Sequence, residues 1–129
     1  NADRQRMDYR LKMEVIFTSP EVAAVGLSEK EAAAQGRKVL VAKYPFNDHG
    51  KSMIMGVEDG FVKIIAAAAD GEILGAQIVG ERASDLIHEL VVAMNCRLTV
   101  SELMNIPHYH PTLAEIVTYP AEEIVGKKL

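Results

Sequence analysis

The chain has 129 residues, of which 49% are hydrophobic and 25% charged, and its formal net charge at pH 7 is −4. These values predict one globular domain with a hydrophobic core. Acidic and basic residues are interspersed, which argues against a nucleic-acid partner, because such a partner requires clustered Lys and Arg.

A single cysteine, Cys96, excludes an internal disulfide and a metal site made of cysteines alone. No apolar run reaches the ~18 residues that a membrane-spanning helix needs, and the polar start NADRQRMDYR does not resemble a signal peptide. We therefore expect a cytoplasmic protein that binds no membrane. Residues 1–12 are poorly patterned and are interpreted as a linker or lead-in, which leaves 13–129 as the domain.

The first half of the chain alternates between strand and turn signals. Ser28 followed by Glu31 is a capping box, which predicts a short alanine-rich helix ending at Gly36. NDHGKS is turn chemistry, so His49 is expected to be solvated. Around these features we predict a strand over 15–17, an extended run over 21–28 and a strand over 38–46.

The next segment predicts a β-hairpin. Two β-rich runs, 61–69 and 72–79, flank Asp70-Gly71, and an Asp-Gly pair between apolar strands is a strong hairpin signal. Gly75 lies inside the second strand and indicates close packing or a bulge.

Three helices are predicted after the hairpin. Ser84 is the expected cap of a helix over 84–96, with His88 at its polar edge and Cys96 as a small buried residue at its end. A short helix then starts at Thr99 or Ser101 and ends at Pro107, and a last one starts near Thr112. The buried face of the long helix follows from its helical spacing and comprises Leu86, Ile87, Leu90, Val91 and Met94.

This order of elements predicts an α+β fold: an antiparallel sheet of four to five strands with helices packed on one face. No strand runs into a glycine-rich loop and helix, so the sequence predicts no cradle for a dinucleotide or phosphate.

The stretch NIPHYHPTLAEIV (105–117) is the candidate site. Its prolines stiffen 106–111, and His110-Pro111 is a candidate cis peptide. Thr112 and Glu115 form a capping-box pattern, and a carboxylate at this position points back toward His110. One carboxylate could therefore close the helix start and also orient an imidazole that accepts a proton near neutral pH.

A metal site is the rival interpretation of the same residues. The H-x-H spacing places His108 and His110 on one side of an extended segment, and zinc accepts two imidazoles with a carboxylate such as Glu115. No further ligand pair is evident nearby.

Three motifs together resemble the C-terminal dimerisation (interface) domain of the pyridine nucleotide-disulfide oxidoreductases, the flavoprotein disulfide reductases. Within that family the pattern H-x-H-P-T-L-x-E is most like the dihydrolipoamide dehydrogenases. The resemblance covers roughly residues 13–117. The motifs are VIFTSPEVAAVGLSE at 15–29, GFVKII…DGEILGAQIVG at 60–80 and HYHPTLAEIV at 108–117.

The resemblance implies a function for the candidate site. A parent enzyme of this kind oxidises dihydrolipoamide through a disulfide and FAD to NAD⁺, and those groups lie outside this chain. His110 would be the catalytic base given to the partner subunit, Glu115 would orient it, and the backbone of His108 and Tyr109 would approach the partner's flavin. The implied partner is a second copy in a homodimer, with a 2-oxo acid dehydrogenase complex as a candidate further partner.

The same resemblance implies that the chain alone binds neither FAD nor NAD and is inactive. Two alternatives stay open at this point. The parent could be another flavoprotein disulfide reductase, since Tyr109 stands where the family often has alanine. The chain could also be a dimerisation module without chemistry.

Overall fold

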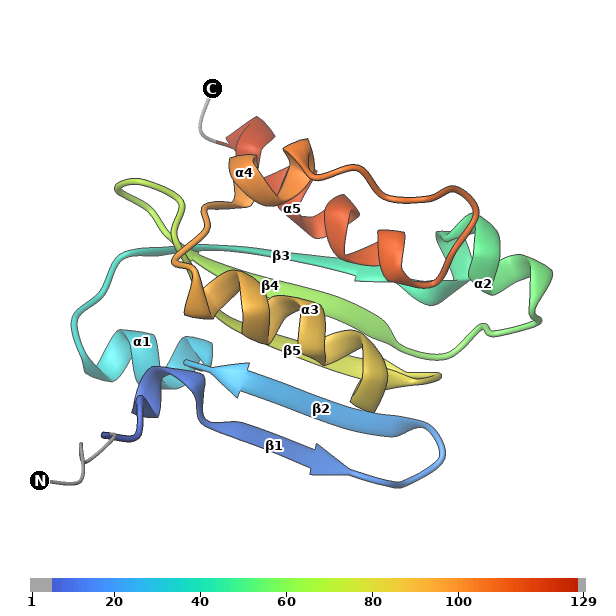
Figure 1. The fold of residues 1–129 in the computed structure, drawn as a ribbon, viewed down its shortest axis with the longest axis horizontal. Helices are drawn as coiled ribbons and strands as arrows, with labels where there is room; N and C mark the ends of the chain where they lie inside the picture. Colours follow the sequence, from blue (N-terminus) through green and yellow to red (C-terminus); the bar gives the residue numbers. More distant parts are fainter. Residues whose placement is uncertain (1–5, 128–129) are drawn as a thin grey trace, which may run out of the picture.

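A computed structural model describes residues 6–127, so residues 1–5 of the expected lead-in and residues 128–129 lie outside the described part. Five strands form one sheet in the spatial order β1-β2-β5-β4-β3, and every neighbouring pair is antiparallel (Figure 1). The predicted α+β fold is confirmed. The strands are β1 (Met13–Ile16), β2 (Glu21–Gly26), β3 (Val39–Pro45), β4 (Phe61–Ala67) and β5 (Ile73–Gly80).

The helical elements are short apart from α3 and α5, and no helix among the described residues is long and apolar enough to cross a membrane. The α-helices are α1 (Glu29–Ala34), α2 (Gly50–Ile54), α3 (Ala83–Asn95), α4 (Val100–Asn105) and α5 (Thr118–Lys127). The 3-10 helices are η1 (Tyr9–Leu11), η2 (Phe46–Asp48) and η3 (Ala114–Val117).

The predicted hairpin is the centre of the sheet. β4 and β5 pair on either side of the Asp70-Gly71 turn, where Gly71 has a φ of 88°. Gly75 meets both expectations: the β4–β5 register shifts opposite it, and a Cβ there would lie 2.0 Å from the carbonyl oxygen of Leu27. The glycine therefore lets the chain after β2 pass closely over β5.

One face of the sheet carries the core. Helix α3 packs on β2 and β5, and α5 packs on β3 and β4, in front of the strands in Figure 1. The helix residues that close this core are fully or nearly buried, and they include the predicted apolar stripe of α3 apart from the half-buried Val91. The two helices lie side by side over different halves of the sheet, so the segment joining them must cross between those halves.

Two expectations for α3 are wrong. Ser84 does not cap it, because the helix begins one residue earlier, after Arg82, and the Ser84 backbone N–H is bonded instead to the Glu21 carboxylate at 2.9 Å. Cys96 is exposed rather than buried, because it follows the last helical turn and the buried face has already passed to Ala93 and Met94.

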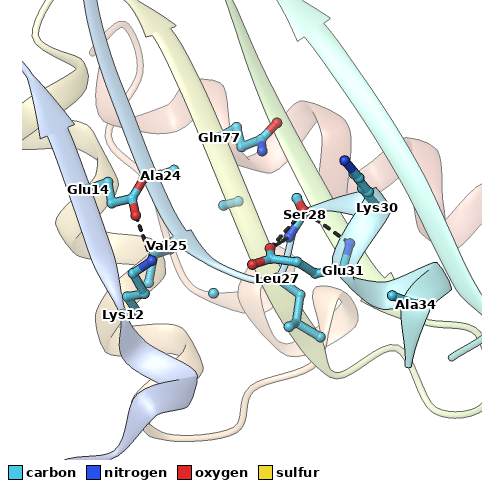
Figure 2. Close-up of a pocket in the computed structure, with 12 residues that line it drawn as sticks. Lys12, Glu14, Ala24, Val25, Leu27, Ser28, Lys30, Glu31, Ala34 and Gln77 are labelled. Atoms are coloured by element: carbon cyan, nitrogen blue, oxygen red, sulfur yellow. Dashed lines mark hydrogen bonds and ion pairs between the residues drawn. The ribbon is translucent and has the colours of Figure 1, made fainter. Parts of the chain in front are cut away.

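The short α1 lies against the end of the other face. Figure 2 shows it in front of the strands, with the predicted capping box closed: Ser28 and Glu31 bond reciprocally. The Lys63 ammonium of β4 reaches Glu29 at 2.8 Å. The hollow between α1 and the sheet has a volume of about 500 Å³.

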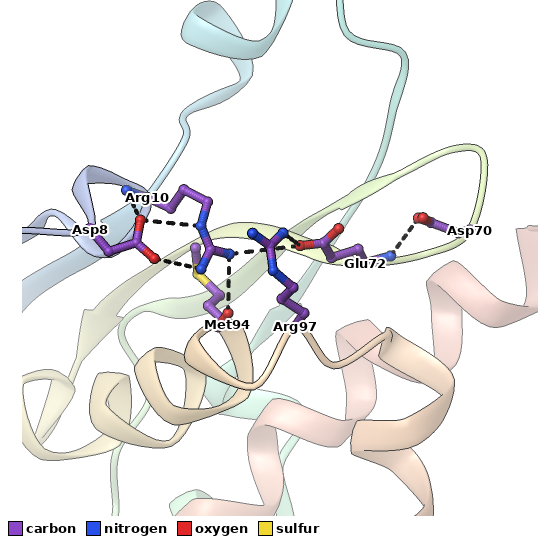
Figure 3. A network of polar contacts seen from close by, with 6 residues as sticks. All are labelled: Asp8, Arg10, Asp70, Glu72, Met94 and Arg97. Carbon is purple, nitrogen blue, oxygen red and sulfur yellow. Dashed lines mark hydrogen bonds and ion pairs between the residues drawn. The ribbon is translucent and has the colours of Figure 1, made fainter. Parts of the chain in front are cut away.

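The segment before β1 is tied to the domain. The Arg10 guanidinium lies between the carboxylates of Asp8, at 2.5 Å, and Glu72, at 3.8 Å (Figure 3). Glu72 also accepts from Arg97 at 3.2 Å. Because Glu72 follows the hairpin turn and Arg97 follows α3, this network joins three separate parts of the fold.

Candidate active site

The loop 106–112 connects α4 to η3 and carries both predicted histidines. His110-Pro111, which the sequence left as a candidate cis peptide, is cis. Tyr109 is 84% exposed, and the His110 side chain is 71% exposed. A hollow of about 460 Å³ lies between the loop and α5, and one of about 510 Å³ lies between the loop and α3.

His110 and Glu115 are in direct contact. Nδ1 of His110 lies 3.0 Å from each oxygen of the Glu115 carboxylate. A carboxylate only accepts, so Nδ1 carries the proton and the neutral ring presents its Nε2 lone pair on the exposed side. The Glu115 side chain is only 8% exposed, which strengthens its interaction with a charged imidazole. The pair is built to accept a proton at Nε2.

The capping box predicted around Glu115 is only half formed. The Glu115 N–H contacts Thr112 Oγ1 at the long distance of 3.4 Å, while that hydroxyl donates to the Tyr109 carbonyl at 2.7 Å. The helix starts as the 3-10 turn η3 at Ala114 rather than near Thr112. The carboxylate has turned away from the helix start because the imidazole binds it instead.

His108 has partners of its own. Its Nδ1 lies 2.8 Å from the Ile106 carbonyl oxygen, and its Nε2 lies 2.6 Å from Glu89 Oε1 on α3. The two imidazoles of the H-x-H pattern therefore bind different carboxylates. Across residues 6–127 no group of three or more His, Cys, Asp or Glu side chains is placed to hold a metal ion. The geometry does not assemble the rival ligand set of His108, His110 and Glu115.

A third histidine lies at this site, and the sequence analysis did not predict it there. His49 was expected to be solvated, but it has no exposed surface, and its Nε2 lies 3.3 Å from Glu115 Oε1. The segment 47–52 is not an open turn but the end of η2 and the start of α2. Phe46, His49 and Ser52 recur every three residues and are all buried, which is the one local signal that could have revealed this face.

Two tyrosines complete the wall behind Glu115. The Tyr119 ring stands edge-on to His49, with centroids 5.5 Å apart, and stacks on Tyr44 at 4.4 Å. Burial raises the pKa of Tyr119 and, with a hydrogen bond to Asp48, raises the pKa of Tyr44 to about 12. Both phenols therefore stay neutral at pH 7.

Comparisons with known proteins identify the family of the chain. The family described as pyridine nucleotide-disulphide oxidoreductase, dimerisation domain, matches residues 13–121. Dihydrolipoyl dehydrogenase of Halobacterium salinarum is 42% identical over 120 residues, which are 93% of this chain and 25% of that protein. The enzyme of the same name from Geobacillus stearothermophilus is 40% identical over 120 residues, 93% of this chain and 26% of that protein.

A solved structure has the same fold. The crystal structure of LpdA from Mycobacterium tuberculosis superposes with a TM-score of 0.87 at 28% identity, covering 93% of this chain and 26% of that one. The chain thus spans about a quarter of the length of the relatives it matches. Because the family match and these relatives extend over most of its sequence, the chain belongs to the dimerisation-domain family of the pyridine nucleotide-disulphide oxidoreductases.

Proposed function

We propose that the chain is the C-terminal interface domain of a dihydrolipoamide dehydrogenase, and that it supplies His110 as the catalytic base to the active site of the partner subunit. The parent would oxidise dihydrolipoamide through a disulfide and FAD to NAD⁺. The names and identities of the relatives support this substrate, and the length that they have beyond this chain leaves room for the other domains.

The His110–Glu115 pair is the observation that carries the proposal. A thiol must lose a proton before its sulfur can attack a disulfide, because the thiolate is the nucleophile. Nε2 of His110 would accept that proton, and the buried Glu115 carboxylate at 3.0 Å would stabilise the imidazolium that forms. The exposed ring would reach a neighbouring subunit more easily than its own core.

We expect this chain to hold neither cofactor. The sheet described here is wholly antiparallel, and in residues 6–127 no strand leads through a glycine-rich loop into a helix. FAD and NAD bound elsewhere in the parent would carry the electrons. This chain would contribute the proton acceptor, with the backbone of His108 and Tyr109 near the partner's flavin. Alone, it would bind neither cofactor and would show no dehydrogenase activity.

The partner that this arrangement requires is a second copy of the parent. The family is defined by dimerisation, and a base on an exposed loop acts usefully only if a neighbouring active site covers it. We therefore propose a homodimer in which this domain forms the two-fold contact. We also propose the cytoplasm as its compartment, as expected from the sequence. A 2-oxo acid dehydrogenase complex would be the assembly that such a parent serves.

The test is His110→Gln in the full-length enzyme. Loss of a positioned base should lower turnover of dihydrolipoamide by roughly 10²–10⁴-fold. Electron transfer from NADH to an artificial dye bypasses the thiol and should be retained. The matched control is His88→Gln, at an exposed histidine of α3, which should leave both rates unchanged. An unaltered dihydrolipoamide rate in the His110 variant would refute the proposal.

A further inference from the structure

The Glu115 carboxylate has a second imidazole on its inner side. His49, at the junction of η2 and α2, is completely buried, and its Nε2 lies 3.3 Å from Glu115 Oε1. The two atoms are close but not aligned as a hydrogen bond. Nε2 is the one buried side-chain nitrogen or oxygen among residues 6–127 without a hydrogen-bond partner. An unpaired polar atom beside a buried carboxylate calls for an account of where its proton lies.

The surroundings of the ring define its protonation. Nδ1 lies 2.8 Å from the Ser52 hydroxyl, which is itself buried and can donate or accept. With the proton on Nδ1, the Nε2 lone pair would face the carboxylate oxygen and repel it. With the proton on Nε2, the ring N–H points toward the negative charge and the Ser52 hydroxyl donates to Nδ1. The second arrangement turns an N–H rather than a lone pair toward the carboxylate and lets Nδ1 accept from Ser52.

The net charge of the ring follows from what packs around it. Glu115 favours protonation, but burial has the larger effect and His110 opposes it, so the pKa of His49 is lowered. The other titratable groups around this cluster are the neutral Tyr119, with Tyr44 and Asp48 behind it, and Glu122 of α5. His49 is therefore neutral at pH 7 beside the Glu115 carboxylate.

We propose that His49 is a positioning residue, a neutral Nε2–H imidazole that holds the Glu115 carboxylate from the core side and keeps it facing Nδ1 of His110. Phe46 holds the segment that carries His49 in place. Its buried ring packs so closely on Gly80 that a Cβ at Gly80 would lie 2.6 Å from a ring carbon. The carboxylate is thus set between a rigid inner imidazole and an exposed outer one. The catalytic consequence rests on the proposed function, but the proton arrangement does not.

The first experiment is nitrogen-15 NMR of the histidine rings in this chain at pH 7. His49 should carry a proton on Nε2 and none on Nδ1, and neutral His110 should carry its proton on Nδ1. A proton on Nδ1 of His49, or protons on both of its nitrogens, would overturn the proposal. This measurement needs no variant and no enzymatic activity.

The second experiment compares His49→Gln with His49→Leu. Glutamine can place an amide N–H where Nε2 was, whereas leucine fills the space without a donor. The leucine variant should lower the Nδ1-protonated fraction of His110, and glutamine should restore it. If leucine leaves that fraction unchanged in a folded chain, His49 does not position Glu115.

The full-length enzyme gives the kinetic counterpart. Loss of one hydrogen-bond donor to a charged group corresponds to about a tenfold fall in turnover for His49→Leu, with His49→Gln within about twofold of the parent. A wild-type rate for His49→Leu would refute the positioning role. If His110→Gln is also fully active while the NMR results hold, the proposed catalytic function fails and the proton arrangement stands.

Discussion

Two helix starts in this chain carry the same motif and use it differently. At the start of α4, Thr99 and Glu102 form a closed box: the Glu102 carboxylate accepts from the Thr99 N–H at 2.7 Å, and Thr99 Oγ1 accepts from the Glu102 N–H at 3.2 Å. At η3, Thr112 and Glu115 have the same spacing, but the carboxylate has left the box for His110.

The difference shows what a local motif decides and what its neighbours decide. The box at α4 is exposed and has no competing donor, so the carboxylate bonds the nearest orphan N–H. At η3 two imidazoles lie within 3.3 Å of the carboxylate, and a bond to an imidazole that can become charged is stronger than one to a backbone amide. The helix start gives up half of its cap and the site gains an oriented base.

The largest expected contrast is in activity. Glu115→Gln in the full-length enzyme should lower turnover of dihydrolipoamide by about 10–100-fold, because it removes the charge that stabilises the His110 imidazolium. Glu102→Gln changes an equivalent carboxylate at the other helix start and should leave turnover unchanged. Steady-state kinetics of the two variants would check this, and equal rates would mean that the Glu115 charge does not support turnover.

A contrast in stability should run the other way. Thr99→Ala removes a complete cap and should lower the free energy of unfolding by about 1 kcal/mol. Thr112→Ala removes only the long 3.4 Å contact to the Glu115 N–H and the bond to Tyr109, so its loss should be smaller. Urea denaturation of this chain measures both. A larger loss for Thr112→Ala would show that its hydroxyl is the main support of η3.

The smallest expected difference between the two regions is in the pH dependence of the free energy of unfolding. Burial lowers the pKa of His49 from its usual 6.5, so the unfolded chain binds a proton in a range where the native chain does not. The free energy of unfolding should therefore fall as the pH drops below about 6.5.

The contribution of the α4 capping box to the free energy of unfolding should change only at lower pH. Hydrogen bonds from Thr99 lower the pKa of Glu102 from 4.5, so its contribution is lost below that value. Urea midpoints between pH 7 and pH 3 would separate the two ranges. His49→Gln should remove the pH dependence of the free energy of unfolding below about pH 6.5 and keep the dependence at lower pH. If the dependence below about pH 6.5 survives this substitution, it arises from groups other than His49.

Much of the site could be predicted because its parts are adjacent in sequence. Glu115 lies only five residues after His110, so one turn and the following helix start are enough to bring the two side chains together. The Asp70-Gly71 hairpin and the Ser28–Glu31 box were predictable for the same reason: each depends on a few neighbouring residues. The start of α3 was not, because Glu21 on β2 satisfies the Ser84 N–H.

Three features follow from the sequence alone, because periodicity, turn chemistry and short spacing act within a few residues: the antiparallel hairpin, the apolar stripe of α3 and the contact between His110 and Glu115. The burial of His49 behind Glu115 depends on the packing of the whole domain. These residues are far apart in the chain and meet because η2 and α2 pack beside the strand end that α5 covers. The spacing of Phe46, His49 and Ser52 can indicate a buried face, but it cannot indicate that Glu115 lies against that face.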